Sequence, residues 1–254
     1  MAGRVNFMAL EGFPETEPGD DLAALIIAAL VAGGTPPAPG DILVVAQKIV
    51  SKAEGRYVDL ATVRPSPRAC DLAATAEKDP RLVEVILSES DEVMRVKPGV
   101  IVVAHRLGFV MANAGIDRSN LGPDGGDRVL LLPHDPDASA EVLRRALEAR
   151  YGVPLGVIIS DSFGRAWRNG VVNVALGAAG LPALIDARGR HDRDGRRLEV
   201  TQIAFADAVA AGAALVMGES NEGTPVVLAR GAISDAPAVK AASLIRPKTE
   251  DLFR

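Results

Sequence analysis

Two short runs of branched, apolar residues constrain the fold of this chain more than any other feature of its sequence. Residues 42–46 are Ile-Leu-Val-Val-Ala, and residues 157–160 are Val-Ile-Ile-Ser. A run that is short and apolar at nearly every position, rather than alternating, is typical of a strand buried on both faces. Such burial requires other elements packed above and below a sheet. The two runs therefore predict a mixed α/β fold.

Helix and strand signals alternate along the rest of the chain. Asp20 or Asp21 can cap a helix through residues 22–31, and Gly33-Gly34 followed by two prolines ends it. Further helices are predicted at residues 68–77, 82–87, 143–150 with Asp137 as the cap, about 201–216 with Gly218 at the end, and 236–244. Further strands are predicted at residues 100–104, 109–112, 129–132 and 225–229. Polar loops are predicted at residues 121–127, expected to be mobile, and 187–195.

Length and composition allow one large domain or two intimate subdomains. The chain has 254 residues, of which 48% are hydrophobic, so it can bury a sizeable core without disulfides. The single cysteine, Cys70, excludes both an intramolecular disulfide and a zinc site built from thiolates. Its neighbours suggest a small buried group on a helix.

Charge and hydropathy narrow the classes of partner. The chain has 28 basic and 33 acidic residues, a formal net charge of −5, so a broad nucleic-acid surface is not expected. The N-terminus lacks the apolar segment of a signal peptide, and no apolar run approaches membrane-spanning length. We expect a cytoplasmic protein that binds small molecules, neither nucleic acid nor membrane.

Two aspartates at the ends of apolar runs indicate a metal site. Asp117 lies in Asn-Ala-Gly-Ile-Asp-Arg-Ser-Asn, and Asp161 precedes Ser162 directly after residues 157–160. Carboxylate and hydroxyl oxygens are the ligands that Mg²⁺ and Mn²⁺ prefer, and such a metal can hold the phosphates of a nucleotide. The alternative is structural, because Asp117 can form an Asx-turn and Asp161 can cap a helix.

Two early loops can bind a nucleotide. In Glu11-Gly12-Phe13-Pro14, glycine allows close approach of the backbone and proline fixes the chain, although an ordinary surface turn explains the segment equally well. A basic loop, Gln47-Lys48-Ile-Val-Ser-Lys52, follows the first apolar run. If it forms a helical turn, Lys48 and Lys52 point the same way and can bind one polyphosphate. Two lysines on a solvated helix face are the common alternative.

Two later loops add polar groups. One has glycine near both ends and acidic residues within, so its backbone N–H groups and carboxylates can serve phosphates and a cation. It comprises Met217, Gly218, Glu219, Ser220, Asn221, Glu222, Gly223 and Thr224. The other spans residues 163–168, where Arg165 and Arg168 flank Trp167. Its arginines can bind an anion and its indole can stack on a ring, unless they form a surface ion pair and a core residue.

Several established site types are absent from the sequence. There is neither a Gly-x-x-x-x-Gly-Lys-Ser/Thr loop nor a Gly-x-Gly-x-x-Gly fingerprint after a strand. His105, His134 and His191 lack the spacing of a zinc helix, and Ser162 lacks a Gly-x-Ser-x-Gly turn. Any metal site in this chain is therefore expected to use oxygen ligands only.

Six sequence blocks, in order, resemble the coenzyme F420-0:L-glutamate ligase (F420 γ-glutamyl ligase) family over essentially the whole chain. The blocks are Gly12-x-Pro14 with Pro18-Gly-Asp-Asp21, the segment 41–55, Ala112-Asn-Ala-Gly-Ile-Asp-x-Ser-Asn120, Ile159-Ser-Asp-Ser-Phe-Gly-Arg165, Asp186-x-x-Gly-x-x-Asp-x-x-Gly195, and Leu215-Val-Met-Gly218. Gln47, Ser162 and Ala166 stand where many relatives are expected to have serine, threonine and proline. Asn173 and Leu107 likewise replace a frequent aspartate and histidine.

The resemblance implies a single catalytic domain over residues 1–254, a mixed α/β fold and an intertwined homodimer. It implies GTP as co-substrate with Mg²⁺ or Mn²⁺, and K⁺ as a further ion. Metal ligands carry over to Asp117, Asp161, Ser162 and Glu219, with Lys48 and Lys52 as catalytic residues. Nucleotide contacts carry over to residues Glu11, Gly12, Phe13, Pro14, Gln47, Lys48, Lys52, Asn120 and the loop 217–224.

The reaction expected from this resemblance is GTP-dependent addition of L-glutamate to a deazaflavin precursor through an acyl phosphate. Another nucleotide-driven carboxylate ligase, or a phosphohydrolase, built on the same site is the alternative within enzymes. A carrier that binds nucleotide or deazaflavin without turnover is the alternative outside them. The clustered carboxylates favour an enzyme.

Overall fold

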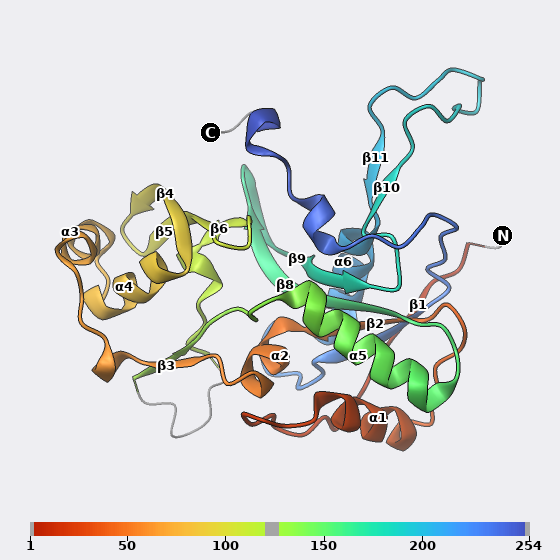
Figure 1. Ribbon diagram of the computed structural model, residues 1–254, viewed down its shortest axis with the longest axis horizontal. Coiled ribbons are helices and arrows are strands. Elements are labelled where there is room, and N and C mark those ends of the chain that lie inside the picture. The colour runs from red at the N-terminus through yellow and green to blue at the C-terminus, as the bar shows by residue number, and fades with distance from the viewer. Residues whose placement is uncertain (1–2, 120–126, 252–254) are drawn as a thin grey trace.

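The computed structural model describes residues 3–119 and 127–251, and its larger part is built on a five-stranded sheet (Figure 1). The strand order is β1 (Asn6–Ala9), β12 (Val226–Arg230), β2 (Ile42–Ala46), β8 (Gly156–Arg165) and β9 (Arg168–Ala179). Strands β2 and β8 pair in parallel, whereas every other neighbouring pair in this sheet is antiparallel. The mixed α/β class predicted from the sequence is confirmed.

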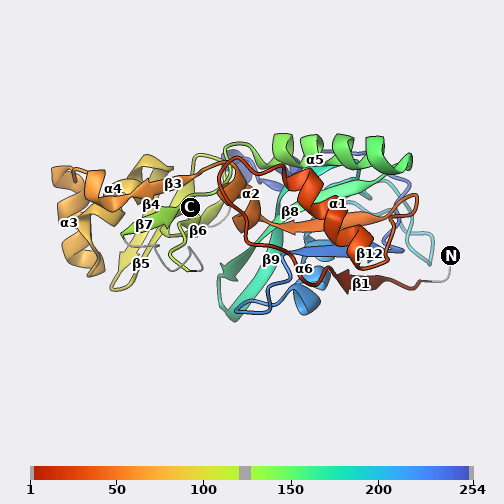
Figure 2. The same cartoon turned by 90° about the horizontal axis from the view of Figure 1, so that it is seen from below.

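Helices cover both faces of the sheet (Figure 2). Helices α1 (Leu22–Ala32) and α5 (Pro136–Tyr151) lie on one face, and α6 (Phe205–Met217) lies on the other. Leu43 and Val45 of β2 contribute to the core beneath α1 and α5, while Ile42 and Val44 contribute to the core beneath α6. Because alternate side chains point to opposite faces, both faces of this strand must be apolar, as its sequence predicts.

A smaller lobe is built on a three-stranded antiparallel sheet. Its strands are β4 (Ser90–Lys97), β5 (Val100–His105) and β6 (Val110–Ala112). Helices α3 (Pro67–Ala76) and α4 (Pro80–Ser88) share a separate hydrophobic core with this sheet. The strands β3 (Tyr57–Asp59) and β7 (Arg128–Leu130) pair with each other where the chain enters and leaves the lobe.

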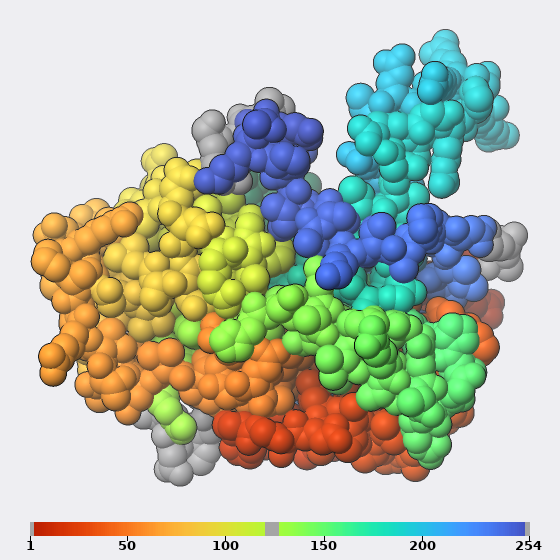
Figure 3. Space-filling model, viewed as in Figure 1, coloured from red at the N-terminus to blue at the C-terminus, as the bar shows by residue number. Residues whose placement is uncertain are grey.

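Shorter elements complete the described chain. They are α2 (Gln47–Ala53), η1 (Leu60–Thr62), η2 (Asn113–Gly115), β10 (Leu184–Asp186), β11 (Gln202–Ala204), η3 (Ala241–Leu244) and η4 (Lys248–Glu250). The chain between β10 and β11 forms an arm that projects from the body (Figures 1 and 3). No helix within the described ranges has the length and apolar character needed to cross a membrane.

Most predicted elements are present within a few residues of their expected bounds, but several local predictions were wrong. Residues 47–52 form helix α2 rather than a loop, and residues 163–168 form the tip of the β8–β9 hairpin. Only the short turn η3 occupies the predicted helix 236–244. Cys70 is on a helix but exposed. The loop 187–195 is confirmed, whereas all of residues 121–127 except Asp127 lie outside the described residues.

Asp137 does not cap helix α5, because Asp135 does so by accepting the N–H of Ala138. Asp137 is instead a buried anchor between three segments. Its Oδ1 accepts the N–H groups of Ala178 in β9 and Ala241 in η3, both at 2.8 Å. Its Oδ2 accepts the N–H of Ala242 at 3.2 Å. One carboxylate thus fixes the C-terminal segment to the sheet and to α5.

Asp137→Ala should lower the free energy of unfolding by about 3 kcal/mol or more, because three backbone N–H groups in a largely buried region lose their acceptor. Urea unfolding monitored by circular dichroism measures this change. Asp135→Ala is the matched control and should cost about 1 kcal/mol, since it removes an exposed helix cap. Equal losses in the two variants would contradict the anchoring role of Asp137.

Candidate active site

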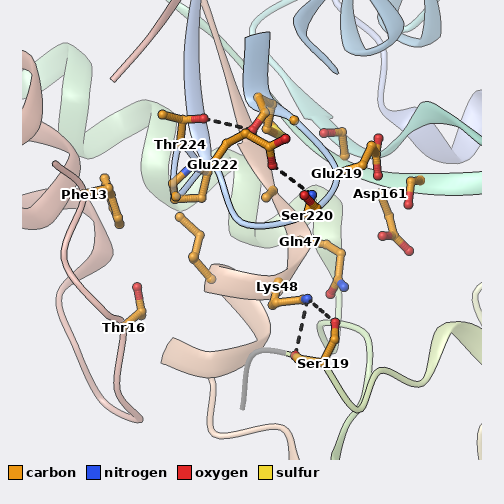
Figure 4. A pocket seen from close by; sticks show the side chains of 18 of the residues that line it. Phe13, Thr16, Gln47, Lys48, Ser119, Asp161, Glu219, Ser220, Glu222 and Thr224 are labelled. Carbon is orange, nitrogen blue, oxygen red and sulfur yellow. Dashed lines mark hydrogen bonds between the residues drawn. The ribbon is translucent and has the colours of Figure 1, made fainter. Parts of the chain in front are cut away.

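A cavity of about 490 Å³ lies beside the paired strands β2 and β8 (Figure 4). Polar side chains form much of its wall, and we call it the polar cavity. Helix α2 starts at the carboxyl end of β2, and the loop between α6 and β12 forms a second wall. The carboxyl ends of parallel strands are where α/β sheets commonly bind ligands. Among the predicted site residues, its walls include Phe13, Pro14, Gln47, Lys48, Lys52, Asp117, Asp161, Ser162 and all of residues 217–224.

Two predicted residues lie away from this wall, and one is outside the described chain. Glu11 and Gly12 are exposed and do not line the cavity, although Phe13 and Pro14 directly after them do. The first loop therefore contributes only its second half. Asn120 lies outside the described residues.

Helix α2 directs both lysines into the cavity. Lys48 and Lys52 are four residues apart and therefore lie on one helical face, and Lys52 is buried, so the solvated-face alternative is wrong for it. The Lys48 Nζ lies 2.7 Å from Oδ2 of Asp117, and Lys52 forms an ion pair with Glu15. Each ammonium group is therefore already paired with a carboxylate.

Asp117 combines the two roles that the sequence left open. A turn of left-handed residues, Asn113, Ala114 and Gly115, precedes it. A Cβ on Gly115 would lie 2.6 Å from the Met111 side chain, so glycine is required there. Oδ1 of Asp117 accepts the N–H of Ser119 at 2.7 Å, which is an Asx-turn, while Oδ2 faces Lys48.

Asp161 is held by a strand and not by a helix cap. It lies in the middle of β8, opposite Val174 of β9, so the N-cap alternative is wrong. Its half-buried side chain lies on the wall of the polar cavity, and the desolvation of the carboxylate there raises the pKa of Asp161 to about 7. The negative charges of Asp117 and Glu219 raise that pKa further, while the backbone N–H of Ser162 and the charge of Lys48 oppose the rise.

Asp117 shows the opposite behaviour. Burial alone would raise its pKa, but hydrogen bonds from Lys48 and Ser119 outweigh the burial and hold the pKa below its usual range. The two aspartates therefore differ because Asp117 has a cationic partner in direct contact and Asp161 has none at that distance among the described residues.

The loop 217–224 is held by its own hydrogen bonds. Helix α6 ends at Gly218, whose φ of +76° favours glycine and where a Cβ would lie 2.2 Å from Cδ of Glu222. The Glu222 carboxylate accepts the N–H of Ser220 at 2.8 Å, and the Thr224 hydroxyl donates to the Met217 carbonyl at 2.8 Å (Figure 4). Glu219 is exposed at the cavity, close enough for its charge to act on Asp161.

The oxygen atoms in the wall of the polar cavity are the kind of donor that a hard cation binds, although the carboxylates do not converge on one position. Within residues 3–119 and 127–251, no three His, Cys, Asp or Glu side chains lie close enough to hold one metal ion. Ser160 Oγ and Asn173 Oδ1 are nevertheless buried in this wall and have no hydrogen-bonding partner in the part of the chain that the structure describes. Unsatisfied oxygens in the same wall as the Asp161 carboxylate are donors of the kind that suits Mg²⁺ or Mn²⁺.

Some site residues were missed by sequence reasoning, and one loop was wrongly included. Glu15, Thr16, Ser119 and Ser160 line the polar cavity. Glu15 could have been recognised only as the partner of Lys52, which depends on the fold. The hairpin tip 165–168 is exposed and does not line the cavity, and Trp167, 83% exposed, is not a core residue.

The raised pKa of Asp161 predicts that the metal-free protein loses stability as the pH rises. An unfolded aspartate has a pKa near 4, so between about pH 4 and about pH 7 the unfolded state loses a proton that the folded state keeps. The free energy of unfolding should fall by roughly 4 kcal/mol at most over this window. Asp161→Asn should remove this decrease.

Urea unfolding in the presence of a chelator, at about pH 5 and at about pH 8, measures the effect. At about pH 8, Asp161→Asn should have a higher free energy of unfolding than the wild-type protein. Parallel pH dependence of the two proteins would contradict the raised pKa.

Comparison with known proteins shows the family of this chain. The family model described as F420-0:Gamma-glutamyl ligase matches residues 12–231. The coenzyme F420:L-glutamate ligase of Methanothermobacter thermautotrophicus is 48% identical over 254 residues, which cover 98% of this chain and 99% of that protein. Proteins of the same name from Methanopyrus kandleri (46% over 244 residues, 94% of each chain) and Archaeoglobus fulgidus (43% over 251 residues, 99% and 97%) are also similar. This chain belongs to the F420-0:γ-glutamyl ligase family.

Proposed function

We propose that this protein is a GTP-dependent ligase that adds L-glutamate, through a γ-glutamyl amide, to the deazaflavin precursor coenzyme F420-0 in coenzyme F420 biosynthesis. The observation that carries the proposal is the polar cavity, where oxygen donors and two ammonium groups face one space. The names of full-length relatives at 42–48% identity support the choice of substrates.

Amide formation from a carboxylate needs activation, because the carboxylate is a poor electrophile and its oxygen is a poor leaving group. In the proposed reaction, a carboxylate oxygen of the precursor attacks the γ-phosphorus of GTP, which gives an acyl phosphate and releases GDP. The amine of glutamate then attacks the acyl carbon, phosphate leaves, and the amine loses a proton. The cavity holds the reactants in position for both steps.

Asp117, Asp161, Ser162 and Glu219 are the residues that would hold Mg²⁺ or Mn²⁺, with K⁺ as a further ion implied by the family resemblance. A bound divalent cation would supply positive charge against the triphosphate. A cation beside Asp161 also favours its ionised form and so lowers its pKa from about 7. The ionised carboxylate of Asp161, which is unfavourable when no cation is bound, is then stabilised as a metal ligand.

Lys48 and Lys52 supply positive charge to the transferred phosphoryl group. Both are paired with carboxylates, Asp117 and Glu15, so binding exchanges partners instead of stripping an isolated ammonium of water. Charge that develops on the phosphoryl oxygens during transfer is then met by groups already directed into the cavity. These two lysines are the proposed catalytic residues.

The remaining walls of the polar cavity are assigned to the nucleotide. Phe13, Pro14, Gln47 and residues 217–224 lie on the wall, and the last of these segments ends a helix with a glycine that frees backbone donors. Glu11, Gly12 and Asn120 remain expectations from the family resemblance. The first two are exposed and do not line the cavity, and the third lies outside the described residues.

We also propose that the protein acts in the cytoplasm as a homodimer. Several large hydrophobic side chains are exposed on the described surface, including Trp167 at 83%, Val200 at 85% and Leu215 at 85%. Exposed apolar groups on the hairpin, the projecting arm and helix α6 are typical of surfaces that meet another chain. The family resemblance implies a homodimer, so the proposed partner is a second copy of this chain.

Asp161→Asn should reduce GTP-dependent glutamate addition by more than about a hundredfold, because it removes a charged oxygen donor at the phosphate site. The assay contains deazaflavin precursor, L-glutamate, GTP and Mg²⁺ or Mn²⁺, and mass spectrometry follows the glutamyl increment together with phosphate release. Asp91→Asn, at an exposed carboxylate of β4, is the matched control and should retain full activity.

Retention of most activity by Asp161→Asn would contradict the assigned role. Phosphate release that is independent of glutamate and precursor would favour a phosphohydrolase. Binding of substrates without any phosphate release by the wild-type protein would favour a carrier.

Sedimentation equilibrium should give twice the chain mass of 26.5 kDa over the micromolar range. The reason is that burying the exposed apolar groups of two copies against each other is favourable. A single-chain mass at every concentration would contradict the homodimer.

A further inference from the structure

A second cavity, of about 310 Å³, adjoins the polar cavity and has no role in the function proposed above. We call it the apolar cavity. It is lined by the turn between β5 and β6, the β8–β9 hairpin, the start of α6 and the C-terminal segment from the end of η3. Its volume lies at the lower end of the range for small-molecule sites, about 300–1,000 Å³.

The walls of the apolar cavity suit a flat aromatic group. Phe109 and Phe163 pack edge to face with ring centroids 5.9 Å apart, and Val174 and Ile245 extend the apolar surface. Val110 lies at the rim and is 43% exposed. Aromatic and branched walls bind conjugated rings through dispersion and quadrupole interactions.

Asp161 connects the two cavities. Phe163 is two residues beyond it on β8, hence on the same face of the strand and about 7 Å away. Val174 is directly opposite Asp161 on β9, where side chains on one face are about 5 Å apart. Asp161 therefore lines the polar cavity while its neighbours along and across the hairpin line the apolar cavity.

One partly buried carboxylate, Asp207, provides a polar contact within the apolar cavity. Its Oδ1 accepts the N–H of Ala175 at 2.9 Å, and among the described residues its Oδ2 has no hydrogen-bonding partner. Burial raises the pKa of Asp207, and its Oδ2 can form a hydrogen bond with a polar group of a bound ring. The cavity thus offers largely apolar walls with a few charged groups, Asp207 together with Arg246 and Asp251 of the C-terminal segment, that can orient a ligand.

We propose that the apolar cavity binds the flat aromatic ring system of the acid substrate, with the carboxylate-bearing tail running past Phe163 and Val174 to Asp161. This assignment rests on the proposed ligase function, because it identifies the place of the acceptor relative to the nucleotide. The acceptor carboxylate has to come within about 3.5 Å of the phosphorus that it attacks. A ring held in the adjoining cavity fixes the tail in that direction and supplies binding energy remote from the reacting atoms.

The test fills the apolar cavity without touching the polar one. Val110→Trp places an indole at the exposed rim, so folding should be unaffected, and Val142→Trp makes the same change at an exposed position of α5 outside both cavities. Steady-state kinetics should show KM for the deazaflavin precursor raised by about tenfold or more in Val110→Trp, with KM for GTP within about twofold of wild type. The control should match wild type in both.

Binding measured without turnover separates this proposal from the proposed function. Fluorescence titration of the deazaflavin precursor, with no GTP or glutamate present, should show weaker binding to Val110→Trp alone. If the wild-type protein adds no glutamate but this loss of binding is seen, the ligase function fails and the ring site stands. Unchanged precursor binding and KM in Val110→Trp would overturn the ring site and leave the ligase function intact. A change of elution volume on gel filtration that accompanies the loss would also overturn it, since the cavity would then be an interface between copies.

Discussion

The parallel pairing of β2 with β8 is the constraint on which the site depends. Ala46 lies opposite Ser160 in this register, so the residue after each is Gln47, which starts helix α2, and Asp161. Parallel strands end at the same edge of a sheet, and this edge is where polar side chains from distant segments can meet without disturbing the core. The apolar residues that hold the two strands together are therefore what bring lysine and aspartate into one cavity.

Within that cavity, the charges are balanced unevenly. Lys48 neutralises Asp117 and Lys52 pairs with Glu15, whereas Asp161 remains without a direct cationic partner among the described residues, and its pKa rises to about 7. A buried carboxylate in this state destabilises the ligand-free fold above its pKa. Such a cost is common at sites where a bound ligand provides the missing charge. The absence of a cationic partner for Asp161 among the described residues is thus better explained by a role in ligand binding than by a role in stability.

Elements whose sequence pattern is set by burial could be predicted, and those set by pairing could not. Residues 42–46 and 157–160 are apolar because helices cover them, so their strands were evident. The continuation of β8 through Asp161 was not, because its polar residues are held in a strand only by pairing with β9. Asp137 was mistaken for a cap because Asp135 and Asp137 both lie at the start of the helix, and only the position of Ala241 shows which of them is buried. Likewise, Phe13 and Pro14 reach the cavity while Glu11 and Gly12 do not, which no local pattern indicates.

The polar extension of β8 explains why the candidate site can have a fixed direction. In a strand, Asp161 and Phe163 share a face by geometry, so a phosphate end and a ring end are held at a constant separation, which a flexible loop would not provide. A shift of one residue in the β8–β9 register would send Asp161 to the opposite face. The register is interrupted between Ile159 and Ser160, where β9 has one extra residue, and such a bulge fixes pairing. Asp207 accepts the N–H of Ala175 at this interruption, so the carboxylate in the apolar cavity also stabilises the register that positions Asp161.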